Sequence, residues 1–267
     1  MFVNSRKGCN LVMDKMTYVW FLLQKLARRK RGNSRDATVS IAFDDNKQNI
    51  YDYAFPLLKS RGMVGTFYVT TDYIRDFSLN SAYMSITELK NLQNYGCEIA
   101  SHSKTHPHFT HISDDQIRSE CSVSKQVLQS HGFQVNNFAY PYGDTNDHVD
   151  SIVRSYYRSG RSAYTPPYIM QLPPSQFRLS GAAGETGDSA RARLMRYKRL
   201  RLVDQVYNAE GWMIIFFHNV VPNPSHARVW HFEIGAQDFA DFLDYLILKG
   251  VKALTVNQAL DDLGVSF

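Results

Sequence analysis

The sequence has little cysteine. Its 267 residues include only Cys9, Cys97 and Cys121. An odd number of cysteines with no Cys-x-x-Cys pair provides neither a disulfide framework nor a thiolate zinc site. We therefore expect buried or free thiols and a protein of a reducing compartment.

The sequence also lacks the run of roughly 20 apolar residues that a spanning helix requires. The nearest candidate, residues 18–23, is short, and the basic residues follow it instead of preceding it. This order argues against an export signal and favours a cytoplasmic location. Residues 18–31 fit two alternatives: a helix packed on the domain, or an amphipathic helix in peripheral contact with a membrane surface. The packed helix is favoured, because amphipathic helices of globular proteins are far commoner.

Motifs for several protein classes are absent as well. The chain has no phosphate-binding loop, no dinucleotide-binding fingerprint and no serine nucleophile elbow. The net charge of +5 fits an anionic substrate, a membrane or nucleic acid without selecting among them. The basic residues of segment 191–201 alternate with apolar ones at helical spacing, which is typical of a solvated helix face. We therefore expect no nucleic-acid partner, and an anionic sugar substrate is the alternative use of this charge.

What the sequence does contain is a regular alternation of strand-like and helix-like segments after residue 36. The predicted strands are 37–43, 64–70, 97–101, 137–140, 212–217 and 251–255. The predicted helices are 50–61, 87–95, 113–131, 145–157, 188–210, 236–249 and 256–263. This alternation predicts an α/β domain over 37–267 whose parallel sheet closes into a barrel. Residues 1–36 are predicted to be a basic, amphipathic appendage, and 160–187, rich in Pro and Gly, to be irregular.

Polar residues follow several of the predicted strands. Asp44 and Asp45 come directly after the first strand, His102 after the third and His218 after the apolar strand 212–217. The carboxyl ends of parallel strands meet on one face, where sites form in such folds. We therefore expect these side chains to lie together, although an Asp-Asp pair alone is more often a turn or cap.

The spacing of two histidines indicates a metal site. His102 and His106 lie four positions apart, which places them on one face of a helical turn if this segment is helical. With one carboxylate they provide a two-histidine, one-aspartate set with open positions, as in catalytic zinc sites. His108 and His111 lie close by, but Pro107 separates them, and we interpret them as loop or packing residues.

Two further segments complete the pattern. Residues 138–143, Phe-Ala-Tyr-Pro-Tyr-Gly, would place a backbone N–H and an aromatic wall at the site; a plain strand followed by a turn is the alternative. His218 on its own would more often be a buried core residue. Its expected position on the same face as the metal favours a role in proton transfer.

These pieces, in this order, resemble the polysaccharide deacetylase family, which carries the NodB homology domain. The matching stretches are residues 39–45, 101–107, 138–143 and 214–218, and the likeness extends over about 37–262. The resemblance implies a distorted (β/α) barrel and hydrolysis of an acetyl group on a glycan. It also implies one divalent metal ion, Zn²⁺ or a related ion such as Co²⁺.

The resemblance assigns roles to matching positions. It implies that Asp44 is the general base and His218 the general acid. It implies that Asp45, His102 and His106 bind the metal. Pro141 and Tyr142 match the segment that faces the substrate, with the Tyr142 N–H donating to the oxyanion.

The chain departs from the family pattern in places. Asn46 stands where the family usually has Gly, and Phe138-Ala-Tyr stands where many members have Arg before Pro-Tyr. The best match to the fourth motif is residues 177–179, which predicts that Arg178 pairs with Asp44. Asp188 is the candidate carboxylate partner of His218.

Three functions remain open at this point. The first is a metal-dependent deacetylase acting on an acetylated sugar, most simply an N-acetyl group of a glycan or its precursor. The second is an amidohydrolase acting on a small non-sugar amide. The third is a glycan-binding module that has lost catalysis, which the complete set of base, ligands and acid disfavours.

Overall fold

The computed structural model describes residues 36–163, 166–170, 174–184, 189–224 and 232–265, with the backbone alone for 189–195. The appendage predicted over 1–36, with its helix at 18–31, lies outside the described residues except for Asp36. The boundary predicted between 36 and 37 therefore stays a prediction.

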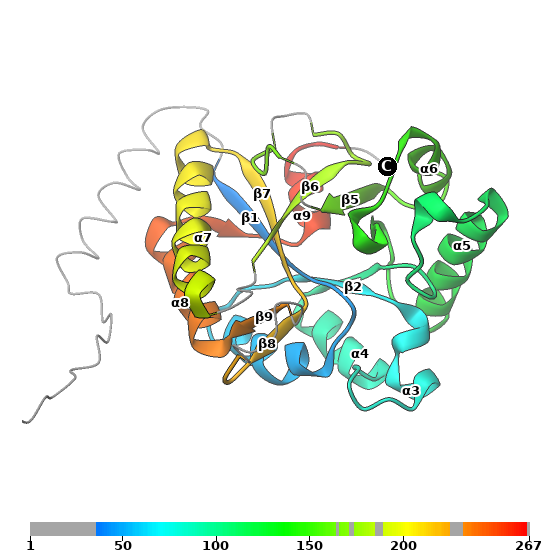
Figure 1. Cartoon of the computed structure of the whole chain (residues 1–267), viewed down its shortest axis with the longest axis horizontal. Helices are drawn as coiled ribbons and strands as arrows, with labels where there is room; N and C mark the ends of the chain where they lie inside the picture. The colour runs from blue at the N-terminus through cyan, green and yellow to red at the C-terminus, as the bar shows by residue number, and fades with distance from the viewer. Residues whose placement is uncertain (1–35, 164–165, 171–173, 185–188, 225–231, 266–267) are drawn as a thin grey trace, which may run out of the picture. The chain divides into compact units, whose positions relative to one another are not determined.

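The predicted barrel is confirmed. Parallel strands follow one another in the order β1 to β7, and β1 also pairs with β7, which closes the sheet (Figure 1). β10 lies beside β1, and β8 and β9 form a separate parallel pair. The strand bounds are β1 Thr38–Phe43, β2 Thr66–Val69, β3 Glu98–Ser101, β4 Asn137–Ala139, β5 Ser159–Ala163, β6 Leu179–Ala183, β7 Trp212–Phe217, β8 Asn219–Val221, β9 Glu233–Gly235 and β10 Lys252–Ala253.

Helices surround the barrel, with α5 beside α6 on one side and α7 beside α8 on another (Figure 1). Their bounds are η1 Ile50–Ala54, α2 Phe55–Lys59, η2 Thr71–Tyr73, α3 Arg75–Ser78, α4 Ile86–Tyr95, η3 Phe109–His111, α5 Asp114–Ser130, η4 Pro141–Gly143, α6 Asp147–Val153, α7 Ser189–Ala209, α8 Ala236–Lys249 and α9 Val256–Asp262. In the described part of the chain, no helix combines the length and the apolar character that crossing a membrane requires.

The two-residue alternation of strands divides the core into an outer and an inner part. In β1, Val39, Ile41 and Phe43 pack outward against the helices, whereas Ala42 packs inside the barrel. Because successive side chains point to opposite faces, Asp44 extends the inward-facing row at the end of β1. The barrel interior thus has an apolar layer that includes Ala42, Tyr68 and Phe216, with polar residues beyond it at the carboxyl ends of the strands.

Helix caps explain where two of the predicted helices begin. The Ser85 hydroxyl accepts from the Glu88 N–H, and Glu88 accepts from the Ser85 N–H, a capping box that starts α4. Ser113 and Gln116 form the same reciprocal pair at α5.

The prediction that 160–187 is irregular is wrong at both ends, because β5 and β6 lie there. Their sequences, Ser-Gly-Arg-Ser-Ala and Leu-Ser-Gly-Ala-Ala, lack the apolar residues that signal a strand. Small residues are required by close packing: a Cβ on Gly160 would lie 2.6 Å from the Tyr140 hydroxyl. In these two strands, the need for small side chains in a crowded barrel wall therefore governs the sequence more than hydrophobicity does.

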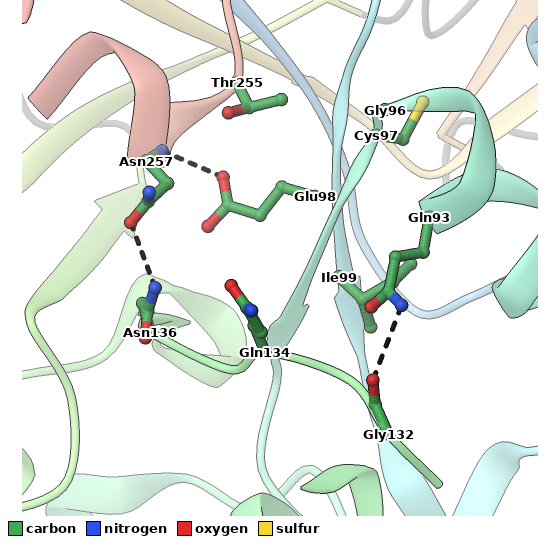
Figure 2. A pocket seen from close by; sticks show the side chains of 10 residues that line it. All are labelled: Gln93, Gly96, Cys97, Glu98, Ile99, Gly132, Gln134, Asn136, Thr255 and Asn257. Carbon is green, nitrogen blue, oxygen red and sulfur yellow. Dashed lines mark hydrogen bonds between the residues drawn. The ribbon is translucent and has the colours of Figure 1, made fainter. Parts of the chain in front are cut away.

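The amino end of the barrel is covered by α9, which is attached through Glu98. One carboxylate oxygen of Glu98 accepts from the Asn257 N–H and from the Thr66 hydroxyl, each at 2.9 Å. The other accepts from the Asn137 amide at 2.6 Å. Figure 2 shows Glu98 pointing toward the first turn of α9 in a polar cavity of about 370 Å³. A carboxylate at a helix amino terminus is electrostatically favourable, so Glu98 helps fix α9 on the barrel.

Candidate metal centre and active site

The polar residues predicted at the strand ends meet at one cavity. Asp44 and Asp45 follow β1, His102 follows β3, and His218 follows β7. Three of them continue inward-facing rows, because they lie two residues beyond Ala42, Ala100 and Phe216 of the inner core. They line a cavity of about 220 Å³ together with Tyr140, Tyr142, Gly143, Arg161, Ala163 and Phe232.

The loop after β1 turns Asp45 toward the same cavity. Asp45 and Asn46 have φ values of +68° and +41°, in the left-handed region that most side chains avoid. Asn tolerates this region better than most residues, which accounts for Asn46 where Gly was expected. The Asn46 amide oxygen also accepts from the Thr70 N–H at 3.1 Å. The departure from the family pattern is therefore compatible with the loop.

The two histidines converge, but not on a helical turn. Residues 102–106 form no helix, and Ser103 and His106 have φ values of +72° and +65°. The expectation of helical spacing is wrong for this segment, although the expected convergence is confirmed. The turn is stabilised from within, because the Ser103 hydroxyl accepts from the His106 N–H at 2.9 Å. Left-handed non-glycine residues are strained and persist where surrounding contacts determine them.

The donor atoms fit a divalent ion. The Nε2 atoms of His102 and His106 lie 3.2 Å apart, and Asp45 Oδ1 lies 3.8 Å from the first and 3.4 Å from the second. Donors of a tetrahedral zinc site are roughly 3.3 Å apart, given metal–ligand bonds of about 2.0–2.1 Å. Asp45 Oδ1 is buried and has no hydrogen-bond partner among the described residues. In the described part of the chain, these three residues are the group that could hold a metal.

The protonation of both histidines suits this purpose. His102 Nδ1 lies 2.8 Å from the Ala139 carbonyl, which can accept only if Nδ1 carries the proton. The Nε2 lone pair of His102 is then directed at the site. Burial lowers the pKa of His102, and burial followed by the neighbouring His102 lowers the pKa of His106 to about 4. Both rings are therefore neutral near pH 7, as metal ligands must be.

Arg161 is the partner of Asp44. Its Nη2 donates to Asp44 Oδ2 at 2.6 Å, and both side chains are buried. The guanidinium lies between two rings, with its central carbon 4.5 Å from the centroid of Phe216 and 5.1 Å from that of Tyr68. Burial acts to raise the pKa of Asp44, but Arg161, with His102 and His218, outweighs it and holds that pKa below its usual value. Asp44 is therefore a carboxylate near neutral pH.

The prediction that Arg178 pairs with Asp44 is wrong. Arg178 lies just before β6, and its half-exposed side chain pairs with Asp150 and Asp147 of α6. Asp150 also accepts from the Tyr140 hydroxyl at 2.8 Å. Arg178 thus contributes to holding α6 against the barrel. Arg161, one strand earlier, occupies the inward-facing position that the base requires.

His218 lies beside Asp44 on the inner side of the site. Its Nε2 is 3.8 Å from Asp44 Oδ2, and its ring is 5.1 Å from that of Phe232 and 5.6 Å from that of Phe216. The candidate partner Asp188 lies outside the described residues. The position of His218 matches the predicted one, at the end of β7 and facing the cavity.

The segment after β4 borders the cavity with Tyr142 and Gly143, whereas the predicted substrate-facing residue Pro141 is buried and does not line it. Pro141 begins the short helix η4, and Tyr142 has a φ of +60°. The exposed Tyr142 ring stacks on His108 at 3.8 Å between centroids and meets His106 edge-on at 4.6 Å. His108 is also 3.2 Å from an Asp144 oxygen, which supports its interpretation as a loop and packing residue. An aromatic surface therefore borders the histidine pair.

The sequence alone did not predict Arg161 as a residue of the site. Its only signal was a charged residue in a run of small residues, and it fell within the segment predicted to be irregular. A strand made of small residues is recognisable only through its neighbours in the barrel. The missing strand therefore hid the partner of the base.

Comparison with known proteins agrees with this geometry. Residues 31–158 match the family model described as polysaccharide deacetylase. The chain is thus similar to the polysaccharide deacetylase family over somewhat less than half of its length. The match contains Asp44, Asp45, His102 and His106, whereas Arg161 and His218 lie beyond it. Arg161 and His218 are therefore assigned to the site from the structure.

Two curated relatives are named as deacetylases. Over 122 residues, the chain is 30% identical to the peptidoglycan-N-acetylmuramic acid deacetylase PdaA of Bacillus subtilis, covering 45% of this chain and 43% of the relative. Over 137 residues, it is 28% identical to a poly-beta-1,6-N-acetyl-D-glucosamine N-deacetylase of Staphylococcus aureus, covering 47% of each. The chain thus spans less than half of each relative's length.

Solved structures share the fold. The Xyl-CE4 domain of a multidomain xylanase from the hindgut metagenome of Trinervitermes trinervoides aligns with a TM-score of 0.60 at 18% identity, over 87% of this chain and 93% of that one. A CE4 family pseudoenzyme from Bacillus anthracis aligns with a TM-score of 0.53 at 17% identity, over 86% of this chain and 67% of that one. At these identities the likeness concerns the fold alone.

Proposed function

We propose that this protein is a metal-dependent hydrolase that removes an acetyl group, in the first place an N-acetyl group, from an amino sugar of a glycan or glycan precursor. One observation carries the proposal: three ligand atoms and two proton-transfer groups share a single cavity. Asp45, His102 and His106 supply the ligands, and Asp44 and His218 lie beside them. This is the set that hydrolysis of an amide requires.

When bound at Asp45, His102 and His106, a divalent ion would lower the pKa of water and polarise the acetyl carbonyl. Asp44 accepts the proton of the attacking water. Its Oδ1 is buried without a hydrogen-bond partner among the described residues, while Arg161 holds Oδ2. The base thus keeps one oxygen for the proton and is oriented through the other.

The remaining steps concern the oxyanion and the leaving group. The loop at Tyr142 borders the cavity, and its N–H is the proposed donor to the oxyanion. His218 donates a proton to the nitrogen as the bond to the acetyl carbon breaks, since an amine leaves poorly without one. His218 Nε2 lies 3.8 Å from Asp44 Oδ2, so the proposed acid and base stand side by side in the cavity.

A second cavity supports a glycan substrate over a small amide. A groove of about 550 Å³ adjoins the first, and Asp45, His218 and Phe232 line both. Its other walls are mainly polar and include Lys47, Asn49 and Asp52. Space on both sides of the ligand set suits a substrate with more than one ring. The named activities of the two relatives, on N-acetylated glycans, agree with this assignment.

The test is acetate release from N-acetylglucosamine oligomers of increasing length, a nucleotide-linked amino sugar, an acetylated xylan and a small acetamide. Chelator-treated protein would be assayed with and without added Zn²⁺ or Co²⁺. We expect release that depends on the metal and increases from the monosaccharide to the oligomers. Release from the small acetamide alone would favour the amidohydrolase.

The inactive binding module is the remaining alternative. The fold alone does not decide against it, because the Bacillus anthracis pseudoenzyme shares that fold. The complete set of ligands, base and acid around one cavity favours catalysis in this chain. Oligomer binding without metal binding or acetate release would support the module and overturn the proposed enzyme.

A further inference from the structure

The turn that carries the two histidines is held from the outside by Glu120 of α5. Glu120 Oε2 accepts from the Lys104 and Thr105 N–H groups, each at 2.8 Å. Glu120 Oε1 accepts from the Thr105 hydroxyl at 2.7 Å. One carboxylate therefore binds the middle of the five-residue segment 102–106, whose first and last residues are the two histidine ligands.

The other side of the turn is fixed by the loop after β2. The carbonyls of Ser103 and Lys104 accept from the Thr71 and Asp72 N–H groups at 3.2 Å and 3.0 Å. The turn thus donates its central N–H groups to α5 and presents its carbonyls to a different element. Glu120 supplies the acceptors that the i, i+4 bonds of a helix would otherwise provide.

α5 itself is anchored close to this contact. Ser124, one helical turn after Glu120, lies with its hydroxyl 2.6 Å from that of Ser101. The Ser101 hydroxyl accepts from the Ser103 N–H at 3.2 Å and from the Tyr157 hydroxyl at 3.0 Å. Glu120 is therefore borne by a helix whose position relative to β3 is already fixed by buried hydrogen bonds.

We propose that Glu120 is a positioning residue of the metal centre, which sets the conformation of residues 102–106 and thereby the spacing of the two histidine Nε2 atoms. It touches none of the three ligand atoms and acts through the backbone between them. Two left-handed residues, Ser103 and His106, make this turn dependent on such outside contacts. The inference rests on the proposed metal-dependent function.

The first test compares the zinc affinity of wild type, Glu120→Ala and Glu120→Gln by competition with a chromophoric chelator. Loss of a group that orients metal ligands typically weakens binding about 10–100-fold, and we expect a loss in this range for Glu120→Ala. Glu120→Gln keeps an oxygen that can accept from both N–H groups, so we expect it to recover much of the affinity. Asp115→Ala, an exposed change on the same helix, controls for loss of one negative charge and should leave affinity within a few-fold.

The second test measures how firmly the turn at residues 102–106 is held in metal-free protein. Amide hydrogen exchange of Lys104 and Thr105, measured by NMR in chelator-treated protein, should accelerate in Glu120→Ala and much less in Glu120→Gln. Exchange in the strands of the barrel should stay unchanged, which separates loosening of the turn from general unfolding. If Glu120→Ala fails to fold, Glu120→Gln and Glu120→Asp carry the comparison, because Asp shortens the reach while keeping the charge.

The outcomes separate the two proposals. Wild-type zinc affinity retained in Glu120→Ala, or unchanged exchange at Lys104 and Thr105, would overturn the positioning role and leave the proposed function standing. A wild-type protein that binds no divalent ion would overturn the proposed function and this role with it.

Discussion

At the residue scale, the adjacent aspartates differ through their surroundings. Asp44 continues the inward row of β1 and meets Arg161 in a buried pair. Asp45 is turned by a positive φ and faces two neutral histidines. The same carboxylate chemistry thus serves as a base held by a cation at one position and as a metal ligand at the next.

We expect Asp44→Asn to lower kcat/KM by about 10²–10⁴ while zinc affinity stays within a few-fold, because the amide cannot accept the proton of water. Asp45→Asn should lower both kcat/KM and zinc affinity, since it removes a charged ligand. Acetate release and zinc titration on the two variants provide the measurements. Equal loss of zinc affinity in both variants would contradict the division of roles.

The pair of Asp44 and Arg161 predicts a pH dependence of stability. Removal of one partner leaves a buried, uncompensated charge, so Arg161→Met should lower the free energy of unfolding near pH 7 by about 3–5 kcal/mol. In the wild type the lowered pKa of Asp44 means that its contribution is present above the unfolded value and is lost as pH falls through the folded pKa. In the variant, burial without Arg161 raises that pKa, so Asp44 becomes protonated as pH falls. The difference in the free energy of unfolding between wild type and variant therefore shrinks.

Urea unfolding of both proteins from pH 7 down to about pH 4.5, with chelator present, measures this difference. Arg178→Met is the matched control, because its half-exposed pairs lie outside the barrel and should contribute less. A deficit for Arg161→Met that stays constant over this range would show that Asp44 does not respond as the pair requires.

At the element scale, each part of the site depends on a segment whose sequence is locally unremarkable. β5 supplies Arg161 from a strand of small residues, and the turn at 102–106 supplies two ligands without helical hydrogen bonds. α9 is only seven residues long and is positioned on the barrel by Glu98 and by its own Thr255 capping box. Short elements of this kind are defined by their contacts more than by intrinsic propensity.

The attachment of α9 gives a prediction at this scale. Glu98→Ala removes the acceptor of three hydrogen bonds, of which Figure 2 shows the one from Asn257, and should lower the free energy of unfolding by roughly 1–3 kcal/mol. Amide exchange in α9 should increase more than exchange in β1. Glu98→Gln retains an acceptor oxygen, so its free energy of unfolding should lie between those of wild type and Glu98→Ala. Equal changes in α9 and β1 would mean that Glu98 stabilises the domain without acting on α9 in particular.

At the scale of the whole molecule, closure of the barrel assembles the site. The pairing of β1 with β7 brings Asp44 beside His218, although 174 positions separate them in the chain. A ligand ion bridging Asp45, His102 and His106 would connect the loop after β1 with the turn after β3. Metal binding should therefore stabilise the folded domain as a whole.

We expect added Zn²⁺ at about 1,000 times its dissociation constant to contribute roughly 4 kcal/mol. For a domain of this size, that corresponds to a rise in Tm of roughly 8–16 °C over chelator-treated protein. Far-UV circular dichroism before unfolding should be unchanged, because the strands and helices do not depend on the ion. His106→Ala should abolish most of the shift, and a shift of wild-type size in that variant would contradict the site.

The sequence by itself determined the barrel class, most of its helices and strands, and the convergence of Asp44, Asp45, His102 and His218. It did so because continuous apolar runs mark buried strands such as β7, and because polar residues at the ends of parallel strands must share one face. Only the tertiary structure decided that β5 and β6 exist, that Arg161 and not Arg178 pairs with Asp44, and that residues 102–106 form a non-helical turn. The physical reason is common to all three: small residues and left-handed backbone carry no local signal, and their conformation is selected by packing inside the barrel and by hydrogen bonds from distant segments.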